Sequence, residues 1–244
     1  MNTVLAVIAA VAALVGLILL FLWRRAGREL ALMQATPISR AAEVGKAAPD
    51  TFVGMKGPLK CDAPLICEFS KQKCIYYRAV IEREYERTTR DSQGRTHTER
   101  QRETVQSNER FAPCALDDGS GRVAIDFTGA DVEAVEAVRR FEPAAGNIVG
   151  AVVGGLLGGN RDIGLYYIES IIAPDMPVYV LGTVRAAGVV GASPGKKNPF
   201  VVSHKSEEER ERDFGRKKLF LMIGAVLCFA LAAGLLIAAI KTGH

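Results

Sequence analysis

Cysteine is the residue type in this chain with the widest chemistry, because a thiolate can bind a metal, act as a nucleophile or form a disulfide. Four cysteines, Cys61, Cys67, Cys74 and Cys114, lie in the polar middle of the chain, separated by 5, 6 and 39 residues. Zinc ribbons and RING domains use closer pairs. We therefore expect buried free thiols, with a four-thiolate zinc site or disulfides as alternatives. Cys228 lies in an apolar run and is expected to fill volume.

No arrangement typical of catalysis is recognisable. His97, His204 and His244 lie in polar or terminal segments, and no serine or cysteine stands in the setting of a known nucleophile. The carboxylates mostly alternate with arginine and lysine, and we place none of them in an apolar stretch that would raise its pKa. We therefore assign no catalytic, cofactor-binding or metal-binding residue and expect no cofactor.

Two other segments could be interpreted as ligand-binding sites. Asp117 and Asp118 precede Gly119 in a segment too short for an EF-hand loop, so we interpret them as a hairpin turn rather than a calcium site. Residues 146–160 are glycine-rich, apolar and uncharged, but they lack the P-loop pattern and are too short to span a bilayer. We interpret them either as a loop that contacts the bilayer or a second copy, or as a floppy insertion.

Two apolar runs bracket the polar middle of the chain. Val4–Trp23 and Leu219–Ile240 each contain about the 20 apolar residues that a membrane-spanning helix needs, without an ionisable residue. Basic residues flank the inner end of each run: Arg24, Arg25 and Arg28, and Arg216, Lys217 and Lys218. The first run is too long for a cleaved signal and has no basic residue before it. We expect a two-pass membrane protein whose middle lies in the cytoplasm, because positive charge favours that side.

The middle of the chain has the pattern of a β domain. Segments rich in β-branched and aromatic residues, strongest at 74–81, predict a mainly β (α+β) fold, a small antiparallel barrel or sandwich between two transmembrane helices. Residues 82–105 predict a long polar hairpin, either a partner-binding arm or a solvated excursion. Residues 131–141 are expected to form a helical turn or loop.

Helix signals and composition complete the domain division. Thr36 before Pro37 predicts a short helix ending at Gly45, and Ser206 before acidic residues predicts a helix that continues into the second run. The expected division is a transmembrane helix at 1–23, a juxtamembrane linker with the short helix at 24–50, the β domain at 51–203, a juxtamembrane helix at 204–218 and a transmembrane helix at 219–240.

The net charge of +4 lies largely beside the apolar runs, and we see no basic stripe interleaved with aromatic residues. We therefore expect no nucleic-acid partner. The expected partners are the lipid bilayer, an unidentified membrane-associated protein and a second copy of the chain.

Four short segments, in order, carry a family resemblance: Cys74–Arg78, Tyr166–Glu169, Pro177–Gly182 and Pro199–Glu208. They resemble the GIDE domain, the membrane-flanked β domain of the mitochondrial E3 ubiquitin ligase family known as MULAN. The two bracketing helices also match, so the resemblance covers nearly the whole chain.

The resemblance implies a function, but this chain differs from those ligases in the region that carries their activity. In those ligases the activity resides in a zinc-binding RING finger after the second span, where this chain has only Lys241–His244. We therefore expect a RING-less member of the kind found in a prokaryotic cell membrane, acting as a scaffold or sensor without a catalytic site. An E3 ubiquitin transferase-like activity and a cysteine-based metal or redox module are the alternatives. In the mitochondrial ligases this domain faces the intermembrane space, which corresponds topologically to the periplasm. The resemblance therefore argues against a cytoplasmic location of the domain.

Overall fold

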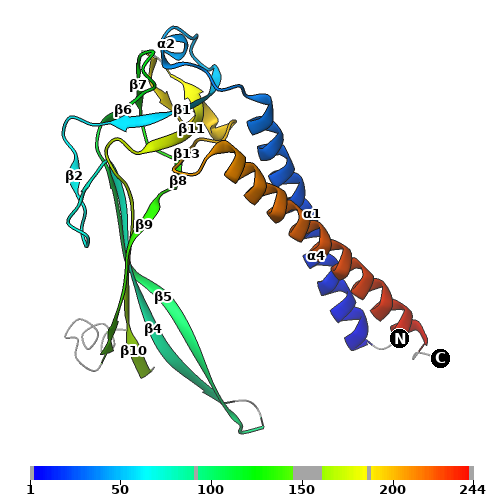
Figure 1. Ribbon diagram of the computed structural model, residues 1–244. Helices are drawn as coiled ribbons and strands as arrows, with labels where there is room; N and C mark the ends of the chain where they lie inside the picture. The colour runs from blue at the N-terminus through cyan, green and yellow to red at the C-terminus, as the bar shows by residue number, and fades with distance from the viewer. Residues whose placement is uncertain (1–2, 91–92, 145–160, 186–187, 242–244) are drawn as a thin grey trace. The chain divides into compact units, whose positions relative to one another are not determined.

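The computed structural model describes residues 3–90, 93–144, 161–185 and 188–241 (Figure 1). The glycine-rich run at 146–160 therefore lies outside the described residues. The chain forms two compact units, one made of Met1–Ile38 with Lys205–His244 and the other of Ser39–His204. The fold is mainly β, with two long apolar helices, as the sequence predicts.

Two long helices, α1 (Thr3–Ala35) and α4 (Glu207–Lys241), form the first unit. Each contains a stretch long and apolar enough to cross a membrane, at Val7–Ala35 and Arg212–Ile240. In the most apolar part of each stretch, only 17% and 11% of the residues are buried by the rest of the protein. A core helix of a soluble protein would be mostly covered, so this exposure is what lipid-facing helices show.

The two helices run antiparallel, side by side (Figure 1). Gly16 of α1 faces Phe229 of α4, and a Cβ atom built on Gly16 would lie 3.1 Å from the phenylalanine ring. Alanine occupies three buried positions of α4 at intervals of seven residues, namely Ala225, Ala232 and Ala239. Small residues let two helix backbones approach closely, which is the usual basis of helix packing in a bilayer.

Local hydrogen bonds cap the two helices where they leave the apolar stretches. Ser206 Oγ accepts from the Glu209 amide at 3.2 Å, and a Glu209 carboxylate oxygen accepts from the Ser206 amide at 3.0 Å, forming the predicted cap of α4. Thr36 Oγ donates to the Leu32 carbonyl at 2.6 Å and so belongs to the end of α1. The prediction that Thr36 opens the short helix is therefore wrong, because its hydroxyl is already engaged. That helix, α2, spans only Ala41–Val44.

Five strands of the second unit close into a barrel. They are β1 (Phe52–Lys60), β6 (Cys114–Asp117), β7 (Arg122–Ile125), β11 (Pro177–Val184) and β12 (Val190–Gly191). They pair in the order β1-β6-β7-β12-β11-β1, and only β7 and β12 are parallel. This is the strand order of the OB fold, a five-stranded Greek-key barrel. The barrel core is fully buried and includes Met55, Leu59, Leu116, Val180 and Val184.

Three short elements extend the barrel sheet on one side. β13 (Val201–Ser203) pairs with β11, and β8 (Asp131–Glu133) pairs in parallel with β13. A 3-10 turn at Pro194–Lys196 lies in the connection between β12 and β13. The expectation of a helical turn or loop at 131–141 is wrong, because these residues find strand partners that are distant in the sequence.

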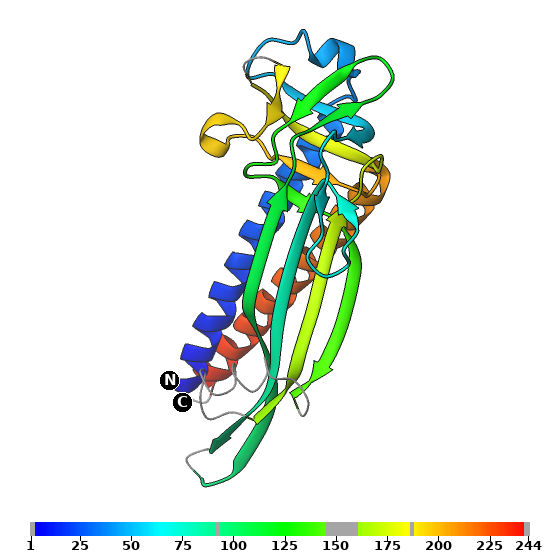
Figure 2. The same cartoon turned by 90° about the vertical axis from the view of Figure 1, so that its left-hand side faces the viewer.

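A four-stranded antiparallel sheet projects from the barrel, in the order β5-β4-β10-β9 (Figure 1, Figure 2). Its strands are β4 (Tyr76–Arg90), β5 (Thr96–Phe111), β9 (Val135–Pro143) and β10 (Arg161–Ile172). The first two lie in the chain between β1 and β6, and the other two between β7 and β11. Two connections of the barrel are thus expanded, and they pair with each other through β4 and β10. The predicted long hairpin is confirmed.

The turn between β6 and β7 holds α2 in place. Asp118 accepts from the Ala41 amide at 2.9 Å, and Ser120 Oγ accepts from the Ala42 amide at 3.2 Å. Gly119 takes a φ of +83°, which glycine adopts at little cost. Hydrogen bonds from Ser120 and then from Ala41 lower the pKa of Asp118 to about 2, so it remains an ionised acceptor at neutral pH. The interpretation of the acidic pair as turn residues is confirmed.

Replacing Gly16 with leucine should weaken the α1–α4 pair, because the new side chain must displace the Phe229 ring. Overpacking of this kind costs about 1–3 kcal/mol. The expected result is a lower midpoint of thermal unfolding in detergent. Gly234→Leu is the matched control, since a Cβ atom there meets nothing within 4 Å. Equal midpoints for the two variants would show that close helix contact at Gly16 does not matter.

Candidate functional site

A small hairpin lies against one face of the four-stranded sheet. It is formed by β2 (Leu65–Ile66) and β3 (Lys73–Cys74), and its loop is held by Glu169 of β10. The Glu169 carboxylate accepts from the Phe69 amide at 2.7 Å and from the Ser70 amide at 2.8 Å. Glu169 is completely buried. Burial of a carboxylate is costly unless it is hydrogen-bonded, and two charge-assisted bonds offset that cost here.

Side chains of the hairpin loop add further contacts to this face. Phe69 packs edge-to-face on Tyr167, with ring centroids 5.4 Å apart. Asn108 of β5 donates to Glu68 at 2.7 Å and to the Tyr77 hydroxyl at 3.3 Å. The hairpin is therefore bonded to β5 and β10, and its Cys67 and Cys74 pack with Tyr77 and Ala79 of β4.

The fold gathers the four cysteines of the β unit close to this hairpin. The thiols of Cys67 and Cys74 are within hydrogen-bonding reach of each other, and the register of β1 with β6 places Cys61 beside Cys114. All four are free, and only Cys61 is more than slightly exposed.

Burial disfavours the thiolate form of three of these thiols. Burial raises the pKa of the Cys67 and Cys74 thiols, and it raises that of Cys114 to about 12. Thiols with such a pKa carry little thiolate and are poor nucleophiles and poor metal ligands. Within the described part of the chain, no three His, Cys, Asp or Glu side chains are placed to hold a metal ion. The arrangement is that of side chains packed in a core.

Farther from the barrel, a buried arginine joins three strands. Arg83 of β4 is only 2% exposed, and its guanidinium donates to Glu103 of β5 at 2.9 Å and to Asp162 of β10 at 2.5 Å. The guanidinium also lies over the Tyr85 ring, 4.8 Å from its centroid. Burial by itself would lower the pKa of Arg83, but the bonds to Glu103 and Asp162 outweigh it and raise the pKa. The sheet is thus cross-linked beyond the reach of the barrel core.

The opposite face of the sheet carries aromatic rings among paired charges. Tyr166 lies between the Arg102 guanidinium, 4.1 Å from its centroid, and the Phe141 ring at 4.7 Å. Arg102 pairs with Glu84 at 3.3 Å. Phe141 remains 38% exposed, and Phe111, at the barrel end of the same face, is 43% exposed. We call this side of the sheet, with Phe111, Tyr166 and Phe141, the aromatic face.

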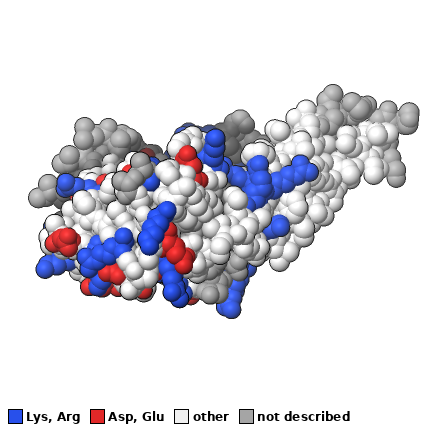
Figure 3. Space-filling model, turned by 90° about the horizontal axis from the view of Figure 1, so that it is seen from above, with Lys and Arg blue, Asp and Glu red and all other residues white. Residues whose placement is uncertain are grey.

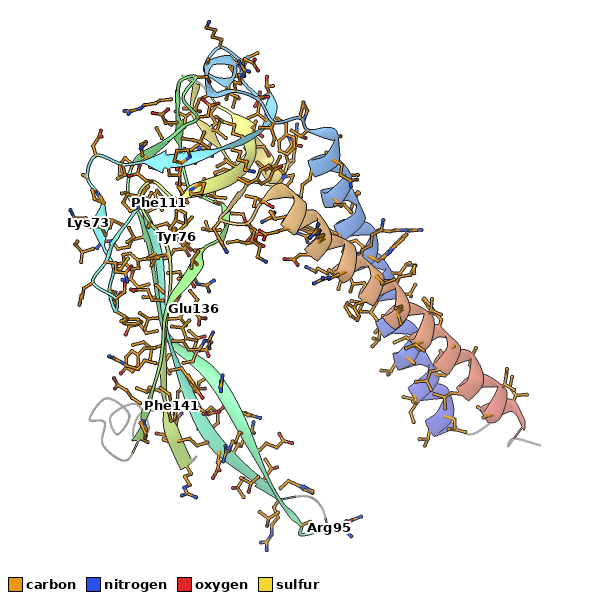
Figure 4. The ribbon with its side chains drawn as sticks, viewed as in Figure 1. Lys73, Tyr76, Arg95, Phe111, Glu136 and Phe141 are labelled. Carbon is orange, nitrogen blue, oxygen red and sulfur yellow. The ribbon has the colours of Figure 1, made fainter. Side chains whose placement is uncertain are left out.

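Figure 4 shows how this face extends along the sheet. Tyr76 and Phe111 lie near the barrel, Glu136 lies partway along, and Phe141 lies closer to the far end. Glu136 forms an ion pair with Arg139 at 2.6 Å. Because the charges on this face largely pair with one another, its exposed rings are the groups with most to gain from contact with another molecule.

The sheet edges are less suited to binding than this face. β5 and β9 are the outer strands, and no described strand pairs with their free edges. In β5 the register slips at Val105, so a bulge interrupts the ladder, and the strand is rich in charged residues. Bulges and charges are the features by which proteins prevent other strands from adding to an edge.

Comparison with protein families decides what kind of chain this is. Residues 83–237 match the family model GIDE, described as E3 ubiquitin ligase, and this is more than half of the 244 residues. The chain belongs to the GIDE family. Searches of curated proteins and of solved structures found no match. The GIDE match begins at Arg83 and includes β5, β10 and Glu169, whereas the β2–β3 hairpin precedes it.

The structure corrects the expectation about where the carboxylates of the β unit lie. We expected no carboxylate in an apolar stretch, and Glu169 contradicts this, since it lies between Ile168 and Ile171 in a mostly apolar strand. A lone acid in such a strand was the available signal. Arg83 gave no signal, because it looks like one more residue of a charged hairpin. His97 lies on β5 and His204 after β13, and His244 lies outside the described residues.

Replacing Glu169 with glutamine should destabilise the β unit. The amide keeps the shape of the side chain, but its NH2 group faces a backbone N–H and leaves that donor unsatisfied. A buried unsatisfied donor costs about 1–3 kcal/mol. Chemical denaturation should show a lower free energy of unfolding and earlier deuterium exchange at Phe69 and Ser70. Glu99→Gln, on exposed β5, is the control, and equal losses in both variants would contradict the role of Glu169.

Proposed function

We propose that this GIDE protein is a membrane-anchored interaction module that presents the aromatic face to a protein partner and has no catalytic site of its own. The observation that carries the proposal is the sheet itself. Two barrel connections are expanded into a projecting sheet, in which buried Glu169 and Arg83 supplement a small apolar cluster that includes Tyr77, Ala79 and Ile171. Connections between OB-fold strands commonly carry ligand-binding residues.

The exposed rings favour a protein as the partner. Phe111 and Phe141 lie on a face where Arg102 contacts Glu84 and the Tyr166 ring, and where Arg139 pairs with Glu136. A nucleic-acid surface would need cations available for phosphates. Aromatic anchors surrounded by polar residues are typical of protein interfaces.

Substitution of Phe141 tests the proposal. Chemical cross-linking in native membranes should join the tagged full-length chain to a partner, and Phe141→Lys should abolish this adduct. Ile66→Lys is the control, because Ile66 is 57% exposed but lies on β2, outside the aromatic face. Unchanged thermal midpoints would establish that both variants fold. A wild-type chain without any adduct, or an adduct that survives Phe141→Lys, would contradict the proposed face.

We further propose that α1 and α4 cross a membrane and that the β unit lies in the cytoplasm. The support is the basic flank of each apolar run. Single cysteines placed in residues 82–105 of a cysteine-free chain should then resist a membrane-impermeant thiol reagent in intact cells. Labelling from outside would reverse the orientation.

An E3 ubiquitin transferase activity is the second candidate, and the family description favours it. It would require recruitment of a ubiquitin-conjugating enzyme. Incubation of the purified chain with ubiquitin and the activating and conjugating enzymes separates the two functions. Ubiquitin transfer to the chain would replace the scaffold proposal with this one. A cysteine-based metal role would instead show as stoichiometric zinc in elemental analysis.

A further inference from the structure

Basic side chains gather at one level of the helix pair. Figure 3 shows Lys and Arg concentrated at one end of the elongated helical part, with an uncharged surface beyond them. We call this group the basic belt, and it consists of Arg24, Arg25 and Arg28 of α1 and Arg212, Arg216, Lys217 and Lys218 of α4. All except Lys218 are exposed, and they lie where the apolar runs of the two helices end.

Contacts between the helices bring the two halves of the belt to the same level. The Lys218 ammonium lies 5.2 Å from the centroid of the Trp23 ring. One turn farther along α1, a Cβ atom on Gly27 would lie 3.5 Å from Lys218 Cε, so the lysine stem packs in ordinary contact with α1. Lys218 therefore lays its apolar stem along the neighbouring helix while its charge stays at the level of the tryptophan.

One described carboxylate, Asp213, lies within the belt and interacts with Arg216 as well as with Lys205. Asp213 pairs with Lys205 at 2.6 Å, and Glu209 accepts from the Ser206 amide at 3.0 Å. Residues 23–29 and 211–218 together carry seven basic and three acidic residues, so the belt keeps a net positive charge next to an apolar surface. Trp23 lies at the boundary between the basic belt and the apolar helix surface, the position that tryptophan favours at a membrane interface.

We propose that the basic belt selects anionic phospholipids from a mixed bilayer and holds them as an annulus around the helix pair. The chemistry recognised is a phosphodiester headgroup with net negative charge, attached to acyl chains that cover the apolar helix surface. A zwitterionic headgroup carries the same phosphate, but its ammonium is repelled by the belt. The inference rests on the proposed membrane anchoring.

Trp23 makes the proposal measurable, because it is the only tryptophan in the chain and lies within the belt. The full chain is reconstituted in phosphatidylcholine vesicles in which an equal fraction of lipid is brominated phosphatidylglycerol or brominated phosphatidylcholine. Bromine quenches tryptophan only at close range. We expect quenching by the anionic lipid to indicate about a twofold to fivefold local enrichment, which should decline as salt screens the belt.

Matched triple variants test whether the belt causes the preference. Arg24→Gln, Arg28→Gln and Arg216→Gln together should bring the quenching ratio close to one. The control removes the same charge from exposed arginines of the sheet, through Arg78→Gln, Arg87→Gln and Arg110→Gln, and should leave the ratio unchanged. Lys218 is kept in both variants, because its contact with Trp23 would alter the fluorescence directly.

The possible results separate this proposal from the one on which it rests. No quenching by either lipid would overturn the membrane anchoring itself. Equal quenching by both lipids in the wild-type chain would leave the anchoring intact and overturn lipid selection. Inorganic phosphate, compared with chloride at equal ionic strength, should not remove the preference. If it does, the belt binds free phosphate rather than lipid, and the lipid proposal is wrong.

Discussion

Pairing of β1 with β11 closes the barrel, and the rest of the β unit depends on this closure. Seven consecutive residue pairs join the strands, from Phe52 with Thr183 to Pro58 with Pro177. The approach is close, since a Cβ atom on Gly182 would lie 2.8 Å from Val190 and 2.9 Å from Phe200. A closed barrel leaves each expanded connection with fixed ends. The two expansions therefore start side by side, which allows β4 and β10 to pair and form the projecting sheet.

A sheet that extends beyond its barrel needs another source of rigidity. Here Glu169 and Arg83 provide it, each through hydrogen bonds that cross strands or tie a hairpin to the sheet. Removing one partner of such a group leaves a buried charge or donor without a hydrogen bond, which is costly. These bonds therefore favour one arrangement of the strands and the hairpin. This rigidity holds the aromatic face in one shape while both of its Phe rings stay exposed.

The two units of the chain are stabilised in different ways. Apolar side chains in the β unit are covered by protein, whereas those of α1 and α4 are mostly uncovered. The helix pair therefore relies on small residues such as Gly16 for close approach and on its surroundings to cover the remaining surface. Basic residues and Trp23 mark the end of that apolar surface.

The features predicted correctly from the sequence are those that depend on neighbouring residues. The two apolar runs, the cap at Ser206, the turn at Asp118 and the 82–105 hairpin each follow from local pattern or turn chemistry. The GIDE resemblance likewise rested on short segments and was confirmed.

Tertiary structure decided what depends on residues far apart in the chain. Residues 131–141 became strands because β13 and β10 offered them partners, and Thr36 ended α1 because the Leu32 carbonyl was within reach. Cys61 and Cys114, separated by 52 residues, came together for the same reason, as did Glu169 and the backbone amides of Phe69 and Ser70. Barrel closure sets these neighbours, and burial then determines whether a charged side chain is solvated or holds the fold together.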